Sequence, residues 1–365
     1  MDPVFVVDAA ILGKKDIVMN ILRADPSYLL KKAKVKNSVG VEYDVTPLQA
    51  AIMTTDIQMA EKMKRGFERL TADLNDQPID GIAEMHRQIK DIYLKSLRSL
   101  QPDTQVSESD DISVIIGAHN QAQEANAFDF KPYVEAILAA SQAELDVVMQ
   151  LINTKPSEEA AQVAASTGVS VTQTDEARAK SFDELTLVEK LNRFREEFVL
   201  HMQNEIIFNP NHILKSLEHN GTTWGKVGKD GVTDPEYKKR TVIFSQLVGW
   251  AQRKAAEPVK QDIRQGTWYL TEEKELHKRP ARFDLDWSAH FFNIVRNPPF
   301  DDVSLVHSAS TEGWGFKFAL RGIGARGPFC APSSRCFQNL CRAKTTSLEN
   351  LCSRAGECGH QTAVA

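Results

Sequence analysis

Apolar residues recur at the spacing of helices over most of the chain. Residues 7–22 predict a tight pair of short helices that meet near a glycine, with the apolar positions of the second helix on one face. Valines and a tyrosine surround Gly40 in the stretch 33–45, which predicts a small β-hairpin. At Thr46-Pro47 the chain enters another helix, because threonine caps a helix well and proline at its first position loses no hydrogen bond.

The same spacing predicts longer helices and one late β element. The predicted helices span residues 55–75, 82–100, 132–153, 191–205 and 235–264. Residues 103–111 are polar and acidic and predict a loop. Residues 155–180 have the composition of an exposed linker, in which we place a domain boundary. Short strands are predicted where apolar and other residues alternate, at 269–270, 283–286 and 314–320.

These elements predict a mainly α protein, with helical hairpins first and a helical domain with a small β element near the C-terminus afterwards. The predicted divisions are a helical domain with capping helices at 1–104, a helix flanked by polar linkers at 105–181, a C-terminal α(+β) domain at 182–326 and a disordered tail at 327–365.

Composition and charge narrow the classes of function. Of the 365 residues, 42% are hydrophobic, which is enough to build cores and excludes global disorder. The net charge of -5 gives no attraction to phosphate backbones, so we expect no nucleic-acid partner. No apolar run approaches the roughly 18 residues of a membrane span, and the acidic start at Met1-Asp2 lacks the basic region of a signal peptide. We therefore expect neither a membrane span nor a signal peptide.

All the cysteines lie in the last 36 residues, where hydrophobic periodicity is weak. They are Cys330, Cys336, Cys341, Cys352 and Cys358. Their spacing contains no C-x2-C pair, the arrangement that presents two thiolates to zinc from one short turn. We predict a disordered tail without zinc, because such a segment buries too little surface to offset the entropy of ordering it. The alternative is a compact zinc knuckle built from the first four of these thiols or from these thiols with His360.

One candidate for metal chemistry occurs in a predicted helix. Glu197, His201 and Glu205 stand four residues apart, so one helical face presents two carboxylates and an imidazole. This pattern suits a metal site that a second helix would complete. The alternative, which we favour, is a charged helix face on which residues four positions apart pair with each other. The basic runs at 237–240 and 253–254 predict a solvated helix face, with acidic partners or anionic lipid as the alternative.

Other motifs carry little chemistry. Trp250 with its polar neighbours Gln252 and Arg253 predicts core packing with polar ties between loops, and a ligand platform is the alternative. No P-loop, G-x-S-x-G or H-E-x-x-H motif occurs. The glycine-rich stretch 321–327 precedes no clear helix, so it lacks the helix N-terminus that a phosphate needs. We therefore predict no catalytic residues, no cofactor and no metal.

Several motifs resemble ankyrin-repeat proteins. Ala9-Ala10 followed by a glycine, and Thr46-Pro47-Leu48-Gln49-Ala50-Ala51, are similar to two repeat units, although the two alanine pairs are 41 residues apart instead of about 33 and Gln49 stands at the common histidine position. Further blocks resemble one group of such proteins, at 192–198, 208–214, 245–253, 265–273 and 313–320. That group comes from bacteria that live inside eukaryotic cells and is delivered by type IV secretion.

The resemblance covers about residues 3–326 and implies a protein-binding effector, located in the bacterial cytoplasm or secreted into that of the host, without agreed catalytic residues. We expect a host or other protein partner to contact the connection 33–45, where Lys36, Asn37, Tyr43 and Asp44 are predicted to be exposed.

The alternative is an enzyme of unknown reaction with a pocket between the two domains. Its predicted lining residues are His212, Trp250, Gln252 and Arg253. A deep pocket with several convergent titratable groups at this place would favour the enzyme.

Overall fold

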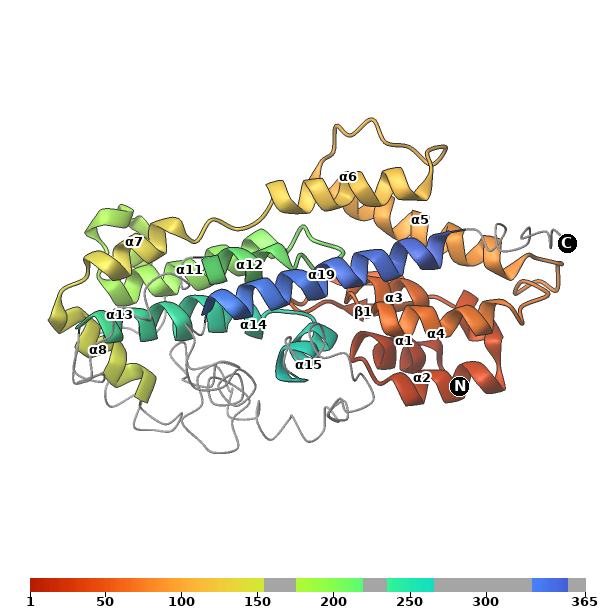
Figure 1. The fold of residues 1–365 in the computed structure, drawn as a ribbon, viewed down its shortest axis with the longest axis horizontal. Coiled ribbons are helices and arrows are strands. Elements are labelled where there is room, and N and C mark those ends of the chain that lie inside the picture. Colours follow the sequence, from red (N-terminus) through yellow and green to blue (C-terminus); the bar gives the residue numbers. More distant parts are fainter. Residues whose placement is uncertain (154–174, 219–234, 266–329, 354–365) are drawn as a thin grey trace, which may run out of the picture.

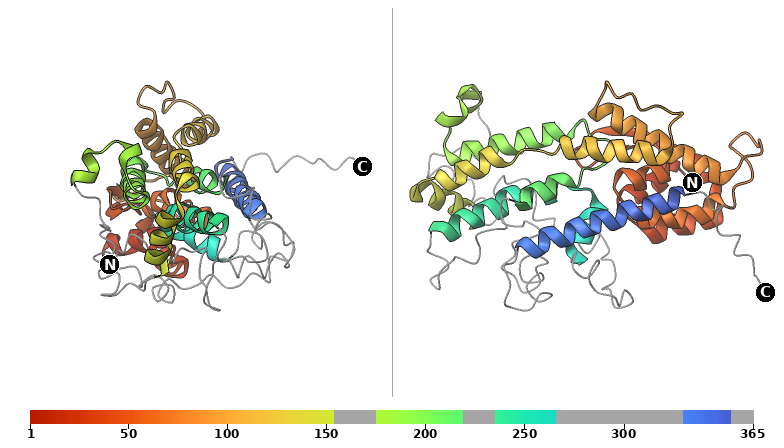
Figure 2. Two further views of the ribbon diagram at one scale, coloured as in Figure 1. Left: turned by 90° about the vertical axis from the view of Figure 1, so that its left-hand side faces the viewer. Right: turned by 45° about the horizontal axis from the view of Figure 1, so that its top comes forward.

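The computed structural model describes residues 1–153, 175–218, 235–265 and 330–353. Over these residues the chain is mainly helical and holds one small two-stranded sheet, which confirms the predicted mainly α fold class (Figure 1). The predicted strands near the C-terminus lie outside the described residues. The helices form an elongated body, with the N-terminal helices at one end and residues 131–153 at the other (Figures 1 and 2).

Two helical hairpins open the chain and stack on each other. Their helices are α1 (Pro3–Ile11), α2 (Lys15–Ala24), α3 (Pro47–Met53) and α4 (Ile57–Phe67). α1 packs against α3, and α2 packs against α4. The turn inside each hairpin has one residue in the left-handed region, Gly13 at φ 68° and Thr55 at φ 56°. Each of these residues stands two positions after the first helix of its hairpin, so the two units are built alike.

The β-hairpin predicted at 33–45 lies between the two units. β1 (Ala33–Lys36) pairs antiparallel with β2 (Glu42–Val45). Gly40 turns the chain at φ 87°. The side chain of Asn37 holds the loop from within, because its Oδ1 accepts hydrogen bonds from the N–H groups of Val39 at 3.1 Å and Val41 at 2.9 Å.

Every residue of α3 is buried, and the helix starts as predicted. Thr46 and Gln49 form a capping box, in which each side chain accepts a hydrogen bond from the other residue's N–H. Gln49 Nε2 also donates to Asp91 Oδ2 at 2.8 Å. Asp91 belongs to α5 (Gly81–Leu100), so Gln49 ties α3 to a helix that packs across it.

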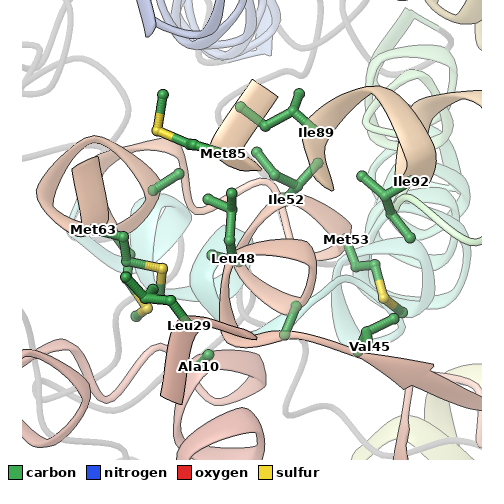
Figure 3. Close-up of a cluster of buried hydrophobic side chains, with 14 of the residues drawn as sticks. Ala10, Leu29, Val45, Leu48, Ile52, Met53, Met63, Met85, Ile89 and Ile92 are labelled. Carbon is green, nitrogen blue, oxygen red and sulfur yellow. The ribbon is translucent and has the colours of Figure 1, made fainter. Parts of the chain in front are cut away.

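α5 and α6 (Ile112–Ala125) complete the first core. α5 packs across α3 and α4, and α6 packs along α5. Apolar side chains from these helices meet in the interior, among them Leu48, Ile52, Met63, Met85 and Ile89 (Figure 3). The predicted loop at 103–111 is confirmed, whereas α6 is not predicted, because small and polar residues interrupt its apolar stripe.

A second core begins at Phe128. Its helices are α7 (Lys131–Ala139), α8 (Gln142–Asn153), α10 (Asp175–Ala179), α11 (Leu187–Met202), α12 (Asn211–Glu218), α13 (Pro235–Val242), α14 (Gly249–Arg253) and α15 (Glu257–Gln265), with a π-helical stretch at Ile243–Val248. The rings of Phe128, Phe130, Phe194 and Phe198 pack at its centre, with neighbouring centroids 5.2 to 5.8 Å apart.

Two predicted boundaries differ from the structure. The predicted helix 132–153 is two helices, because Ala140 is extended and Ser141 Oγ caps α8 by accepting from the Glu144 N–H. The change from the first core to the second falls between α6 and α7, not in the stretch 155–180. The segment 105–181 is therefore not a helix flanked by linkers, since α6 belongs to the first core and α7 and α8 to the second.

The prediction of a disordered tail is wrong over residues 330–352, which form α19 (Cys330–Cys352). This helix runs along both cores (Figures 1 and 2), with Phe337 and Leu340 in the second core and Leu348 and Leu351 in the first. The apolar residues follow helical spacing, but they stand singly among serines, threonines and basic residues, which weakens the signal in the sequence. Packing on two cores stabilises a helix that its own sequence only weakly favours.

α19 also excludes the zinc knuckle built from the first four thiols, whereas Cys358 and His360 lie outside the described residues. Cys341 and Cys352 lie eleven residues apart in one helix, which is about 16 Å along its axis, so they cannot ligate the same ion. Both are free thiols packed against the cores. Burial raises the pKa of each thiol to about 12.

We expect Cys341, which is half-buried, and Cys352, which is buried, to resist alkylation in the folded protein, because a thiol packed against a core with a raised pKa holds almost no thiolate. Iodoacetamide labelling at mildly alkaline pH, mapped by mass spectrometry, should modify both thiols at least about 100-fold more slowly in native protein than in guanidinium chloride. Similar rates in the two states would contradict the packing of α19.

The junction of α4 and α5 leaves room for glycine alone. A Cβ at Gly81 would lie 1.9 Å from the carbonyl oxygen of Phe67, whereas a Cβ at Gly117, inside α6, would meet nothing within 4 Å. We expect Gly81→Ala to lower the free energy of unfolding by more than about 2 kcal/mol. Gly117→Ala should raise it by up to about 1 kcal/mol, because alanine favours a helix. Urea denaturation measures both, and effects of the same sign would contradict this difference in packing.

Candidate functional site at the junction of the two cores

Residues 204–209 connect α11 to α12 and lie between the two cores. We call them the junction segment. Ile207 packs in the first core and Phe208 in the second. The segment has no helix or strand, so its backbone groups need partners from other elements. The Phe208 N–H donates to the Met53 carbonyl at 2.9 Å, and Ser99 Oγ donates to the Asn204 carbonyl at 2.6 Å.

Gln123 of α6 provides a second connection to the junction segment. Its Nε2 donates to the carbonyl of Ile207 at 3.1 Å and to that of Phe208 at 3.3 Å. Its backbone carbonyl accepts from Asn209 Nδ2 at 2.7 Å. Helices of the first core therefore satisfy the polar groups of a segment that follows them by more than 80 residues in the sequence.

Glu205 and His212 form a buried pair beside this segment. Glu205 is 3% exposed and His212 is fully buried, and His212 Nε2 lies 2.8 Å from Glu205 Oε1. His212 Nδ1 accepts a hydrogen bond from the Phe128 N–H at 3.0 Å, so this nitrogen carries no proton. The ring is therefore neutral with its proton on Nε2, and Nε2–H donates to Glu205.

The carboxylate of Glu205 has no cationic partner among the described residues. Its Oε1 takes two further long contacts from the amides of Asn126 at 3.5 Å and Asn209 at 3.4 Å, while Oε2 accepts no hydrogen bond. His212 cannot supply the positive charge while it accepts from Phe128, because its second proton would occupy Nδ1. Burying an unpaired carboxylate costs several kcal/mol, so a positive charge would be stabilised here.

The geometry at Glu205 does not suit a metal ion, although the ligand atoms of His201, Glu205 and His212 lie within 4.8 Å of one another. His201 fits such a role, since its Nε2 donates to the Asn126 carbonyl at 2.7 Å and leaves Nδ1 for a metal. His212 does not fit, because the proton on its Nε2 faces Glu205. Two ligands remain, and a protein zinc site usually has three or four.

The predicted face of Glu197, His201 and Glu205 does not form. α11 ends at Met202, so Glu205 lies beyond the helix. Glu197 accepts a hydrogen bond from the Tyr133 hydroxyl, His201 bonds to a backbone carbonyl and Glu205 pairs with the buried histidine. The three side chains therefore have three different partners, and the favoured prediction of a charged face with pairs four residues apart is wrong for them.

The β-hairpin packs against the junction segment. Asn37 Nδ2 donates to the Glu205 carbonyl at 3.4 Å, and the Tyr43 hydroxyl lies 3.5 Å from the same oxygen. Burial and the nearby Glu205 charge raise the pKa of Tyr43. Lys36 and Asp44 are exposed as predicted, whereas Asn37 and Tyr43 are half-buried. The prediction that all four residues are exposed is thus wrong for these two, because the sequence does not show what the hairpin packs on.

A cavity of about 180 Å³ opens beside Glu205. Leu12 at the end of α1, Lys36 and Asn37 of the hairpin, and Glu257 at the start of α15 line it together with Glu205. Most of the remaining lining is apolar and comes from Ile11, Met53, Met202, Ile206, Phe208 and Ala256. The wall of the cavity is therefore largely apolar, and Glu205 Oε2 is not exposed to it.

The residues predicted to line an enzyme pocket do not line this cavity. His212 is buried against Glu205, and Gln252 is buried in the second core. Trp250 is half-buried, with the Arg195 guanidinium 5.4 Å and the Lys254 ammonium 4.8 Å from its ring. The side chain of Arg253 lies outside the described residues.

The sequence alone does not indicate the buried pair of Ser96 and His119, because the two residues are far apart in the sequence. Ser96 Oγ lies 2.8 Å from His119 Nε2 and accepts from the Ile207 N–H at 3.3 Å. Both side chains are at most 1% exposed, and burial lowers the pKa of His119 to about 4. Although a serine beside a neutral histidine is the arrangement of a nucleophile and its base, this pair has no surface access and holds the junction segment.

No protein family, curated protein or solved structure matches the chain. Among the described residues, no helix is long and apolar enough to cross a membrane.

We expect Glu205 and His212 to be strongly coupled. His212→Phe should lower the free energy of unfolding by about 3 kcal/mol, because it leaves the carboxylate and the Phe128 N–H without a partner. Adding Glu205→Leu should restore at least about 1 kcal/mol, since it removes the buried charge. Urea unfolding of the single and double variants measures the coupling, with His86→Phe at a half-buried site as the control. Additive losses in the double variant would contradict the pairing.

Proposed function

We propose that the protein is a non-enzymatic protein-binding module, and that the outer face of α1 is its contact surface. The observation that supports this most is the exposure of large apolar side chains on that face. Val4 is 39% exposed, Phe5 is 52% exposed and Leu12 is 37% exposed. Ile17 of α2 adds a further apolar side chain that is 37% exposed.

The exposed residues of α1 recur at the spacing of one helical face. Val4, Phe5, Asp8 and Leu12 follow each other at intervals of one, three and four residues, whereas Val6, Val7, Ala9 and Ala10 are buried against the neighbouring elements. The outer repeat of a stacked helical protein normally has a polar face toward water. Several exposed apolar side chains on that face are typical of a protein contact.

The resemblance to ankyrin-repeat effectors supports a host protein as the partner. The paired helices, the left-handed turn residues and the intervening β-hairpin are consistent with two repeat units of that kind. The contact surface proposed here lies on α1, because two of the four hairpin residues first considered, Asn37 and Tyr43, are half-buried against the junction segment.

Photo-crosslinking from α1 tests this function. We expect p-benzoylphenylalanine at position 5 to link covalently to a defined protein from a eukaryotic cell lysate. The matched control is the same group at position 74, because Leu74 is 53% exposed and Phe5 is 52% exposed. Val4→Asp in the position-5 protein should abolish the crosslink, since a charge cannot enter an apolar contact, without changing the thermal unfolding temperature.

Two results would count against the proposal. One is the recovery of the same set of proteins from positions 5 and 74, which would indicate non-specific contact by any exposed apolar residue. The other is a crosslink at position 5 that persists in the Val4→Asp variant.

A further inference from the structure

We infer that the cavity at the end of α1 binds an aromatic side chain of the protein that covers α1. The cavity has a volume of about 180 Å³, and Leu12 and Lys36 line it together with residues of both cores. The inference rests on the proposed function for the source of the ring. The cavity as a site for a ring rests on its size, its lining and its position.

The size of the cavity suits one aromatic ring. Apolar cavities of about 150 Å³ in proteins bind benzene, so a volume of about 180 Å³ accommodates a phenyl or phenol group. Cofactors and other small molecules usually occupy pockets of about 300 to 1,000 Å³. A single side chain of a partner therefore fits this cavity better than a cofactor does.

The wall that a ligand can reach is apolar. Leu12 is 37% exposed, and Ile11 and Ile206 are half-buried, so these three residues present apolar surface at the cavity. Met53 and Met202 also line the cavity but are only 2% exposed, so they lie at its inner end. Methionine adapts its shape to a neighbour, and its sulfur makes favourable contacts with aromatic rings. A ring against this wall would remove apolar surface from water.

The charged residues at the cavity favour a neutral ring. Glu257 forms an ion pair with Lys260 at 2.5 Å, so its charge is balanced. Lys36 is exposed and has no ion pair among the described residues, because Glu42, which faces it across the hairpin, pairs with Lys34 at 3.0 Å. An ammonium group is attracted to the face of an aromatic ring but not to an aliphatic side chain. Lys36 therefore distinguishes a ring from an aliphatic group.

The cavity adjoins the contact surface on α1. Leu12 belongs to both, since it lines the cavity and lies on the exposed face. Phe5 stands seven residues before Leu12, which is about 10 Å along a helix. A partner that covers Phe5 therefore lies close enough to place a side chain in the cavity. Aromatic side chains that fill a pocket at a contact surface often dominate the affinity of a protein complex.

Phe5 of a second copy is the alternative occupant, because it is an exposed ring that the chain itself supplies. An antiparallel pair of α1 helices that sets Phe5 opposite Leu12 would also bring the two exposed Asp8 carboxylates close together at its centre. Like charges that face each other in this way oppose association. We therefore assign the cavity to a protein of different sequence.

p-Cresol, the side chain of tyrosine, is the probe for this site, with 4-methylcyclohexanol as a saturated control of similar size. Titration of the full chain with labelled isoleucine methyl groups should shift the NMR signals of Ile11 and Ile206, because ring currents act at short range. The signals of Ile89 and Ile137, which belong to the two cores and do not line the cavity, should not move. We expect p-cresol to bind at least about threefold more tightly than the control.

Two exposed positions of α1 give a matched pair of variants. Leu12 is 37% exposed and Val4 is 39% exposed, but only Leu12 lines the cavity. Leu12→Ser should weaken p-cresol binding at least threefold, whereas Val4→Ser should leave it unchanged, and neither should alter the thermal unfolding temperature. Lys36→Gln should weaken the binding of p-cresol about two- to fivefold but not that of 4-methylcyclohexanol. Equal binding of the two probes, or wild-type binding of p-cresol by Leu12→Ser, would overturn the inference.

Competition connects the cavity to the partner that the crosslink at position 5 identifies. Saturating p-cresol should weaken the binding of this partner at least fivefold. Replacement of one aromatic residue of the partner by alanine should weaken the complex at least tenfold and make it insensitive to p-cresol. A complex that p-cresol does not affect would show that the partner leaves the cavity empty, which contradicts the inference.

The outcomes separate the site from the proposed function. A specific crosslink from position 5 together with no p-cresol binding would refute the cavity as a site and retain the contact surface on α1. p-Cresol binding together with no specific crosslink would refute the proposed function and remove the source of the ring. A crosslink from position 5 to a second copy of the chain, with dimers in sedimentation that Phe5→Ala abolishes, would assign the cavity to Phe5 and so refute the inference.

Discussion

The structure depends on satisfying the backbone of a buried segment without regular secondary structure. Residues 204–209 lie between two cores, where no helix or strand ladder can pair their N–H and C=O groups. Each unpaired group would cost about 1 to 3 kcal/mol. Ser96 and Ser99 of α5, Gln123 of α6 and the carbonyl of Met53 provide the missing partners. Since all of these belong to the first core, the two cores cannot move apart without breaking several buried hydrogen bonds.

The same requirement determines the chemistry beside Glu205. The Phe128 N–H, at the start of the second core, needs an acceptor, and His212 Nδ1 supplies it. That bond fixes the proton of the neutral ring on Nε2 and directs it to Glu205. A backbone constraint thus leaves a buried carboxylate without a cation among the residues that the structure describes.

Local patterns in the sequence predict helices and turns more reliably than they predict which elements pack against each other. Thr46-Pro47 predicts the start of α3 because capping depends on residues three positions apart, and Gly40 marks the hairpin turn for a similar reason. α19 is not predicted, because it is stabilised by packing on two cores whose other residues are distant from it in the sequence. For the candidate site, the sequence places His201 and Glu205 in one motif and singles out His212 and Asn37 for other reasons. It cannot bring them together, since their contacts depend on where α11 ends and on what the hairpin packs against.

The position of the cavity explains how contact at one end of the molecule can involve both cores. Its wall contains Leu12 from the first helical unit, Asn37 from the hairpin, Glu205 from the junction segment and Glu257 from the second core. Because a ligand stabilises whichever arrangement it binds, a partner that occupies this cavity would favour the packed arrangement of the two cores over any in which the junction segment is open.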